Sequence, residues 1–237
     1  MTDFPTIPRW SFSALSVFET CPYWAYLRYI QRHKEPTPDP NSPVVRGQNI
    51  HNEAEFYVTN GGDLPLSLRK FKEKFQALRE LYLENCVELE QEWGIDKNWN
   101  TVSWQDPLLW GRIKLDAFVR LFKKARVIDY KTGKSWGNEV KHGQQGLTYA
   151  VTAFMRHPDL EEIDIEFWYL DEGDKKKPKT ITREMAIRHL PKIHNRADIM
   201  TSTTDFKPKP NQHNCRWCPY RPGKLDVCPY GVNTDDK

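Results

Sequence analysis

The sequence predicts an α/β protein in which helices flank a mixed central β-sheet. Three observations support this fold class. Helical patterns occupy much of the first part of the chain, a period of two typical of strands follows over about residues 88–131, and a helical segment then precedes two more short strands. Strands and helices in this succession form layered α/β domains. We expect a single domain over residues 1–237, since this length can bury one sizeable core.

The first helical segment is expected over residues 11–30. Ser11 or Ser13 supplies its N-cap, and Pro22 should kink the segment or divide it into two helices. A proline-rich connector, EPTPDPNSP, comes next and separates this segment from the following helix.

Two further helices are expected before the strands. The segment VVRGQNIHNEAEFYVTNGG has the pattern of a helix closed by the Gly61-Gly62 pair. A longer amphipathic helix is expected from about Leu66 to Leu89. Cys86 lies inside this expected helix, and we interpret it as a core thiol.

Residues 111–131 predict a β-hairpin that turns near residues 123–124. With that turn, Asp116 lies opposite Lys131 and diagonal to Asp129. Side chains alternate between the two faces of a strand, so Asp129 and Lys131 share one face. The hairpin therefore gathers two acids and a lysine in one patch.

Helices and strands are expected to alternate over the rest of the chain. A helix is predicted over residues 139–157, strands over 163–170 and 179–183, and a last helix, interrupted by Pro191, over 184–200. The final 30 residues are rich in turns and carry three cysteines.

The composition narrows the class of protein. With 35 Lys and Arg against 32 Asp and Glu, the formal net charge is only +3, so the total charge does not by itself indicate a nucleic-acid partner. Nine Trp, 10 Tyr and 11 Phe offer surfaces on which bases or partners can stack. No apolar run reaches about 18 residues and the N-terminus lacks a signal pattern, so we expect a cytoplasmic protein without membrane contact.

The acidic patch on the hairpin allows two interpretations. Asp116, Asp129 and Lys131 could form a cross-strand salt bridge on a solvated face. Alternatively, the two carboxylates hold a divalent cation, which relieves their repulsion, acidifies bound water and neutralises phosphate charge. Lys131 would then orient the attacking water or stabilise the transition state. These parts suit the hydrolysis of a phosphodiester bond.

Asp116 followed by Asp129-Tyr130-Lys131 resembles the D…(D/E)-x-K core of the PD-(D/E)XK nuclease superfamily. The longer DYKTGK has the form seen in RecB-like nucleases, and the resemblance extends over nearly the whole chain. It implies that Asp116, Asp129 and the backbone carbonyl of Tyr130 hold Mg2+ or Mn2+. His51, which ends RGQNIH, is similar to the histidine that those enzymes use as an additional metal ligand.

Two more features resemble this family. The segment QGLTY supplies Gln145 and Tyr149, which are similar to the Q-x3-Y helix motif beside the active site. The resemblance implies that these two residues position DNA or the lysine. Glu92 resembles a strand glutamate that often precedes the hairpin and binds metal, and Glu88 and Glu90 compete for the same role.

Three of the five cysteines lie near the C-terminus. Cys215, Cys218 and Cys228 form a C-x2-C-x9-C arrangement, and Cys21 lies near the other end of the chain. Two thiolates in a C-x2-C turn can converge on one ion or cluster, and four cysteines complete its coordination. The spacing leaves zinc and [4Fe-4S] both open, together with the plainer alternative of unconnected free thiols.

The context of Cys21, SALSVFETCP, resembles that of iron-sulfur nucleases of the AddAB and CRISPR-associated RecB-like types. Those proteins carry one cysteine near the N-terminus and three near the C-terminus. The resemblance therefore implies a [4Fe-4S] cluster, with zinc as the alternative, bound by elements at about residues 11–31 and 211–231. Such a cluster would join the two chain ends and close a very long loop, which restricts the unfolded chain.

The resemblance implies a metal-dependent DNA exonuclease that acts on single strands or duplex ends. The sequence contains no G-x4-G-K-[ST] phosphate loop, so a helicase or recombination partner would have to supply any motor activity. Two alternatives stay open. One is a structure-specific DNA endonuclease with the same chemistry, and the other is a non-catalytic DNA-binding module, stapled by iron-sulfur or zinc, whose acids form salt bridges.

Overall fold

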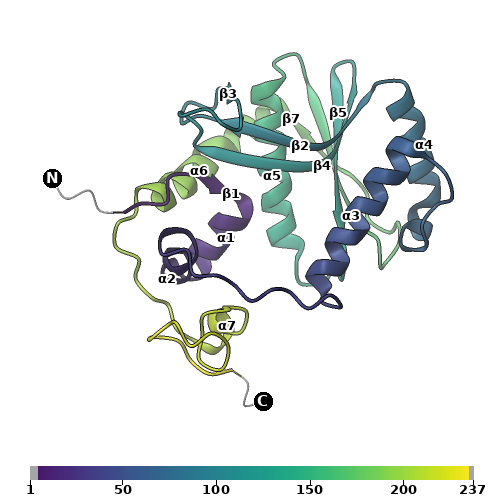
Figure 1. Ribbon diagram of the computed structural model, residues 1–237. Helices are drawn as coiled ribbons and strands as arrows, with labels where there is room; N and C mark the ends of the chain where they lie inside the picture. Colours follow the sequence, from purple (N-terminus) through teal and green to yellow (C-terminus); the bar gives the residue numbers. More distant parts are fainter. Residues whose placement is uncertain (1–4, 235–237) are drawn as a thin grey trace. The chain divides into compact units, whose positions relative to one another are not determined.

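The computed structural model describes residues 5–234, and the chain divides into two compact units. The first unit combines the residues up to Thr37 with those from Lys192 onward, and the second runs from Pro38 to Pro191. The two segments expected to carry the cluster-binding cysteines, 11–31 and 211–231, both belong to the first unit. The acidic hairpin belongs to the second unit (Figure 1).

The second unit is built on a β-sheet with the strand order β3-β2-β4-β5-β6-β7. Its strands are β2 (Val87–Ile95), β3 (Thr101–Val102), β4 (Gly111–Leu121), β5 (Lys124–Lys131), β6 (Glu162–Tyr169) and β7 (Lys179–Thr182). Neighbouring strands are antiparallel except β5 and β6, which run parallel. The predicted mixed sheet is therefore confirmed.

Helices cover both faces of this sheet (Figure 1). They are α3 (Pro43–Asn60), the 3-10 helix η2 (Leu66–Phe71), α4 (Lys72–Leu83) and α5 (Glu139–Arg156). Helices α3 and α4 pack on one face, where Ala117, Val119 and Ile128 from the hairpin join their apolar core. Phe118 lies between two of these residues and points the other way, stacking on His157 just beyond α5. The alternation of side chains thus directs Phe118 and its neighbours Ala117 and Val119 to different helical layers.

The amphipathic helix expected from Leu66 to Leu89 is shorter than predicted. Helix α4 ends at Leu83, and Asn85 takes a left-handed φ of 59°, which turns the chain out of the helix. Strand β2 begins two residues later. Cys86 accordingly lies in the connection and is half-buried, so its interpretation as a core thiol within a helix is wrong.

The hairpin forms with a register two residues from the expected one. It turns at Phe122 and Lys123, and Ala117 pairs with Ile128. Continued by one residue, this register places Asp116 opposite Asp129 rather than opposite Lys131. A shift of two leaves every side chain on its predicted face, because the strand repeats every two residues.

The first unit is mainly helical. Its elements are β1 (Trp10–Ser11), α1 (Phe12–Thr20), α2 (Pro22–Ala25), the π-helix η1 (Tyr26–Ile30) and α7 (Gln212–Cys215). Ser11 caps α1, with its hydroxyl accepting the backbone N–H of Ala14 at 3.2 Å, and Pro22 begins α2, as predicted. Helix α6 (Arg183–Ser202) contains the boundary between the units and continues through Pro191, where an interruption was expected.

None of the helices within residues 5–234 combines the length and apolar character needed to cross a membrane.

Candidate active site

Asp116 on β4 is held by contacts from two other elements. Its Oδ2 accepts the backbone N–H of Tyr130 at 2.6 Å. Its Oδ1 lies 3.3 Å from Nδ1 of His51, which comes from α3. His51 also donates from Nε2 to the carbonyl oxygen of Tyr130 at 3.1 Å. The structure therefore brings together the acid, the imidazole and the carbonyl that the sequence singled out.

Charge is concentrated around Asp116. Burial raises its pKa, and the neighbouring charge of Asp129 raises it further. Burial lowers the pKa of His51, but the hydrogen bond and the charge of Asp116 raise that pKa overall. A carboxylate whose pKa is raised by burial and by a second carboxylate is stabilised by a nearby cation. The chemistry of this corner fits a positively charged ligand.

Glu90 on β2 faces the same corner. It stands between the two residues that pair with Ala117 and Leu115 on β4, and so it lies opposite Asp116. One ligand atom each of His51, Glu90 and Asp116 lies within 4.8 Å of the other two. Loss of hydration and then the charge of Asp116 raise the pKa of Glu90 to about 7.

Glu92 meets a different partner. The sheet register pairs it with Lys114, and its Oε1 lies 2.5 Å from Nζ of that lysine. Its side chain is 43 % exposed. Of the three glutamates that competed for the strand position, the structure places Glu90 rather than Glu92 beside His51 and Asp116.

Asp129 on β5 is held by contacts from helix α5. Its Oδ1 accepts hydrogen bonds from the hydroxyl of Tyr149 at 2.7 Å and from Nε2 of Gln145 at 3.2 Å. Gln145 also donates to the Tyr149 oxygen at 2.6 Å, because residues four apart lie on one face of a helix. Burial and the charge of Asp129 raise the pKa of Tyr149 well above its usual value, so this hydroxyl stays a donor.

Lys131 lies beside the same carboxylate. Its Nζ is 2.6 Å from Oδ2 of Asp129, a charge contact rather than a well-aligned hydrogen bond. Nζ also donates to Oε1 of Gln145 at 3.1 Å. The Gln145 amide thus contacts the acid through its nitrogen and the lysine through its oxygen. One side chain sets the positions of both groups.

In the first unit, Cys21, Cys215, Cys218 and Cys228 line one small cavity. The backbone N–H of Cys218 donates to the carbonyl of Cys215 at 3.0 Å, which closes the turn between these two thiols. Burial and then the charges of the other three thiols raise the pKa of Cys218 to about 11. Burial, and then the charges of Cys21 and Cys215, also raise the pKa of Cys228. Thiols gathered in this way match a site for a cationic group.

A model of the PD-(D/E)XK nuclease superfamily matches residues 9–229 of the chain. The chain belongs to this superfamily. Among solved structures, SSO0001 is 14 % identical over 98 % of this chain and 91 % of its own, with a TM-score of 0.48. A candidate exonuclease from Eubacterium rectale is 13 % identical over 85 % and 84 %, with a TM-score of 0.50, which supports the fold alone. No curated protein matches the sequence.

Membership of the PD-(D/E)XK superfamily supports nuclease activity, and members of it use divalent metals.

Two side chains near the site had no place in the sequence-based prediction. Phe167 pairs with Asp129 across the parallel β5–β6 register, and its ring lies 5.5 Å from Nζ of Lys131. His142 stacks on that ring from α5, with centroids 5.3 Å apart. Neither could be recognised without knowing that β5 and β6 are neighbours, although His142 lies one helical turn before Gln145.

Proposed function

We propose that this protein is a metal-dependent deoxyribonuclease, and that it acts as an exonuclease on single-stranded DNA or duplex ends. One observation carries the proposal. The sheet register aligns Glu90, Asp116 and Asp129 on three adjacent strands, and Lys131, two residues after Asp129 on β5, places its Nζ 2.6 Å from Oδ2 of Asp129. The preference for ends rests on the resemblance to RecB-like nucleases.

The donor set fits a divalent cation. His51, Asp116, Asp129 and the carbonyl of Tyr130 would hold it, with Glu90 in the place expected for Glu92. Oxygen ligands with one imidazole suit Mg2+ or Mn2+. A metal bound there supplies an acidified water and neutralises charge on the phosphate.

The protein's own groups have separate tasks. Lys131 places a positive charge beside Asp129, where it can orient the attacking water or stabilise the charge that develops on the phosphate. Gln145 and Tyr149 both donate to Oδ1 of Asp129 and so leave its Oδ2 to Lys131. We assign these two residues a positioning role.

We propose that the four cysteines bind a [4Fe-4S] cluster with a structural role, and zinc is the alternative. Among the described residues, no three cysteine sulfurs all lie within 4.8 Å of one another. A tetrahedral zinc site would bring its sulfurs to about 4 Å from each other, whereas a four-iron cluster holds them farther apart. The sulfurs are therefore farther apart than a closed tetrahedral zinc site requires, and the choice of [4Fe-4S] rests on the resemblance to iron-sulfur nucleases.

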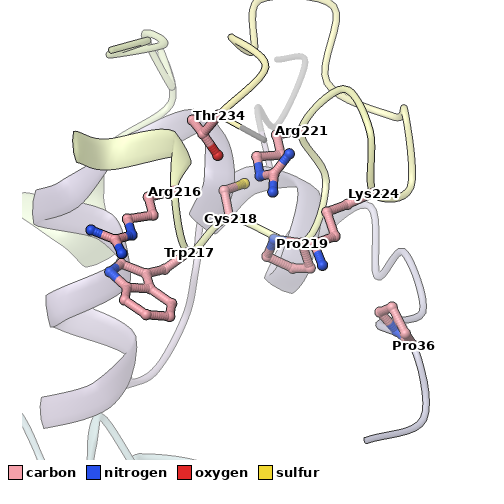
Figure 2. A pocket seen from close by; sticks show the side chains of 8 residues that line it. All are labelled: Pro36, Arg216, Trp217, Cys218, Pro219, Arg221, Lys224 and Thr234. Carbon is pink, nitrogen blue, oxygen red and sulfur yellow. The ribbon is translucent and has the colours of Figure 1, made fainter. Parts of the chain in front are cut away.

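A basic pocket in the first unit offers a surface for DNA. Figure 2 shows its lining, in which the exposed Arg216 and Lys224 supply positive charge, while Arg221 is buried. Trp217 is 73 % exposed, and the Arg216 guanidinium lies 5.2 Å from its ring centroid. Exposed aromatic rings among cations bind single-stranded nucleic acid by stacking and by phosphate contact.

The association with a helicase or recombination partner and the location in the cytoplasm stay predictions.

The test uses end-labelled single-stranded and duplex DNA, with linear and circular forms of each, in Mg2+, in Mn2+ and in chelator. We expect metal-dependent shortening of linear DNA. Asp129→Asn and Lys131→Ala should each lower cleavage at least about 100-fold without loss of fold, since both act on the transition state. Lys123→Ala, at the exposed far end of the hairpin, is the control and should retain activity.

Each contrary outcome has a distinct meaning. Cleavage that survives the chelator rejects the metal mechanism, and near wild-type activity of Asp129→Asn rejects the assigned site. Cleavage of circular DNA supports the endonuclease alternative. Binding of DNA without cleavage under every condition supports the non-catalytic module.

A further inference from the structure

A pocket of about 300 Å³ opens in the second unit between helix α5 and strands β6 and β7. This volume lies within the range of sites that hold small organic groups. Phe167 and Ile165 from β6 form its apolar floor, and His142 and Gly143 from α5 form one wall. We call it the α5–β6 pocket.

The α5–β6 pocket shares a wall with the candidate active site. Phe167 contacts both: its ring lies 5.5 Å from Nζ of Lys131 and stacks on His142 inside the pocket. His142 also contacts the hydroxyl of Tyr169 through Nδ1 at 2.6 Å, which fixes the plane of the imidazole. A group held in the pocket would therefore lie next to the phosphodiester bond at which Lys131 is proposed to act.

The chemistry of the pocket is aromatic inside and cationic at its edge. Burial and then the charge of Lys131 lower the pKa of His142 to about 4, so its ring is neutral at physiological pH and offers an aromatic face. Three lysines also line the pocket: Lys176, Lys177 and Lys179. The lining includes one acid, Glu139. Aromatic planes with adjacent cations match a nucleobase and its phosphates.

The helix has no side chain where the ligand would enter. A Cβ atom added at Gly143 would have no heavy atom within 4 Å, so the space beside this residue is open. At Gly146, one turn along, an added Cβ would approach Ile165 to 2.7 Å. Gly146 therefore serves the packing of helix on sheet, while Gly143 leaves the pocket accessible.

We propose that the α5–β6 pocket binds one unpaired nucleobase beside the scissile phosphate. The three lysines would contact the phosphates of the same DNA strand. This inference rests on the proposed nuclease function and narrows its substrate to DNA that is single-stranded where it is cut. A paired base inside a duplex cannot enter such a pocket without leaving its stack, which costs free energy. Duplex ends would be cut only after they fray.

The test compares Gly143→Met, which fills the pocket, with Val140→Met, which adds similar bulk at a 76 % exposed position of the same helix. Binding is measured in chelator by fluorescence anisotropy, with labelled single strands that carry either normal nucleotides or abasic ones at the end. We expect Gly143→Met to bind normal strands about 10-fold more weakly, the size of one lost base stack. Abasic ends should bind wild type and Gly143→Met equally.

Cleavage of the same strands in Mn2+ gives a second measurement. The wild type and Val140→Met should cut normal ends about 10-fold faster than abasic ends, and Gly143→Met should cut both at the slow rate. Equal treatment of normal and abasic ends by the wild type would overturn the pocket assignment and leave the nuclease proposal standing. Base-dependent binding without any cleavage would support the pocket assignment and overturn the nuclease proposal.

Discussion

Glu90 and Glu92 lie two residues apart on β2, but Glu90 faces an acid and Glu92 faces a lysine. Glu90 lies opposite Asp116, and burial, followed by the charge of that acid, raises the pKa of Glu90 to about 7. Glu92 lies opposite Lys114 and is neutralised by it. A carboxylate that is destabilised by its neighbours gains most from a bound cation.

This difference predicts that Glu90→Gln will impair catalysis and Glu92→Gln will not. Glu90→Gln removes a charged oxygen ligand, so we expect a higher Mg2+ or Mn2+ concentration for half-maximal activity and at least about a 10-fold loss of rate. Glu92→Gln keeps the same length and strand position and serves as the matched control. Metal titrations of cleavage provide the measurement, and equal behaviour of the two variants would remove Glu90 from the metal site.

The sequence identified this region without resolving the choice between the two glutamates. Asp116, Asp129 and Lys131 follow from the hairpin and its resemblance to a known motif. The role of Glu90 depends on the β2–β4 register, which a long and irregular connection between the strands leaves undetermined in the sequence.

Helix α5 carries much of the candidate site, and a single arginine fixes the chain beyond its C-terminus. The Arg183 guanidinium donates to the carbonyl oxygens of Phe154, His157, Pro158 and Leu160 at 2.7–3.1 Å. These carbonyls belong to the end of α5 and to the turn that leads into β6. A planar group with five N–H donors can satisfy several acceptors at once.

We predict that Arg183→Lys destabilises the protein by about 2–3 kcal/mol, because one ammonium leaves several of these carbonyls without a charged donor. The control is Arg188→Lys on the same helix, whose exposed ion pair with Glu184 should matter by less than about 0.5 kcal/mol. Urea unfolding monitored by circular dichroism gives both values. A loss for Arg183→Lys no larger than that for Arg188→Lys would contradict the structural role.

Elements were predicted better than their ends. The strands of the hairpin, α5 and the short strands after it appear where the periodicity placed them. The end of α4 was missed because Val87 and Leu89 fit either a helical or a strand pattern, and only the left-handed Asn85 decides between them. The hairpin register was missed because the turn could close on either of two neighbouring residue pairs.

At the scale of the whole molecule, the first unit contains both ends of the described chain, and its cysteines come from both. Cys21 follows α1, and the other three come from residues 215–228. The sequence could indicate this convergence only through resemblance, since residues so far apart have no local pattern that links them. The structure adds a common cavity and mutual electrostatic contact.

The last prediction concerns the group in that cavity. Anaerobically purified protein should be brown, with broad absorption near about 400 nm and about four irons per chain, as thiolate-ligated [4Fe-4S] clusters are. Cys21→Ser, or the same change at any of the other three cavity cysteines, should lose the colour and lower the Tm, because three ligands no longer join the two chain segments. Cys86→Ser is the control and should keep the colour and the Tm of the wild type, since Cys86 belongs to the second unit. Colourless protein with one zinc per chain would replace the cluster by zinc and leave the acids of the hairpin unaffected, because their chemistry uses no cysteine.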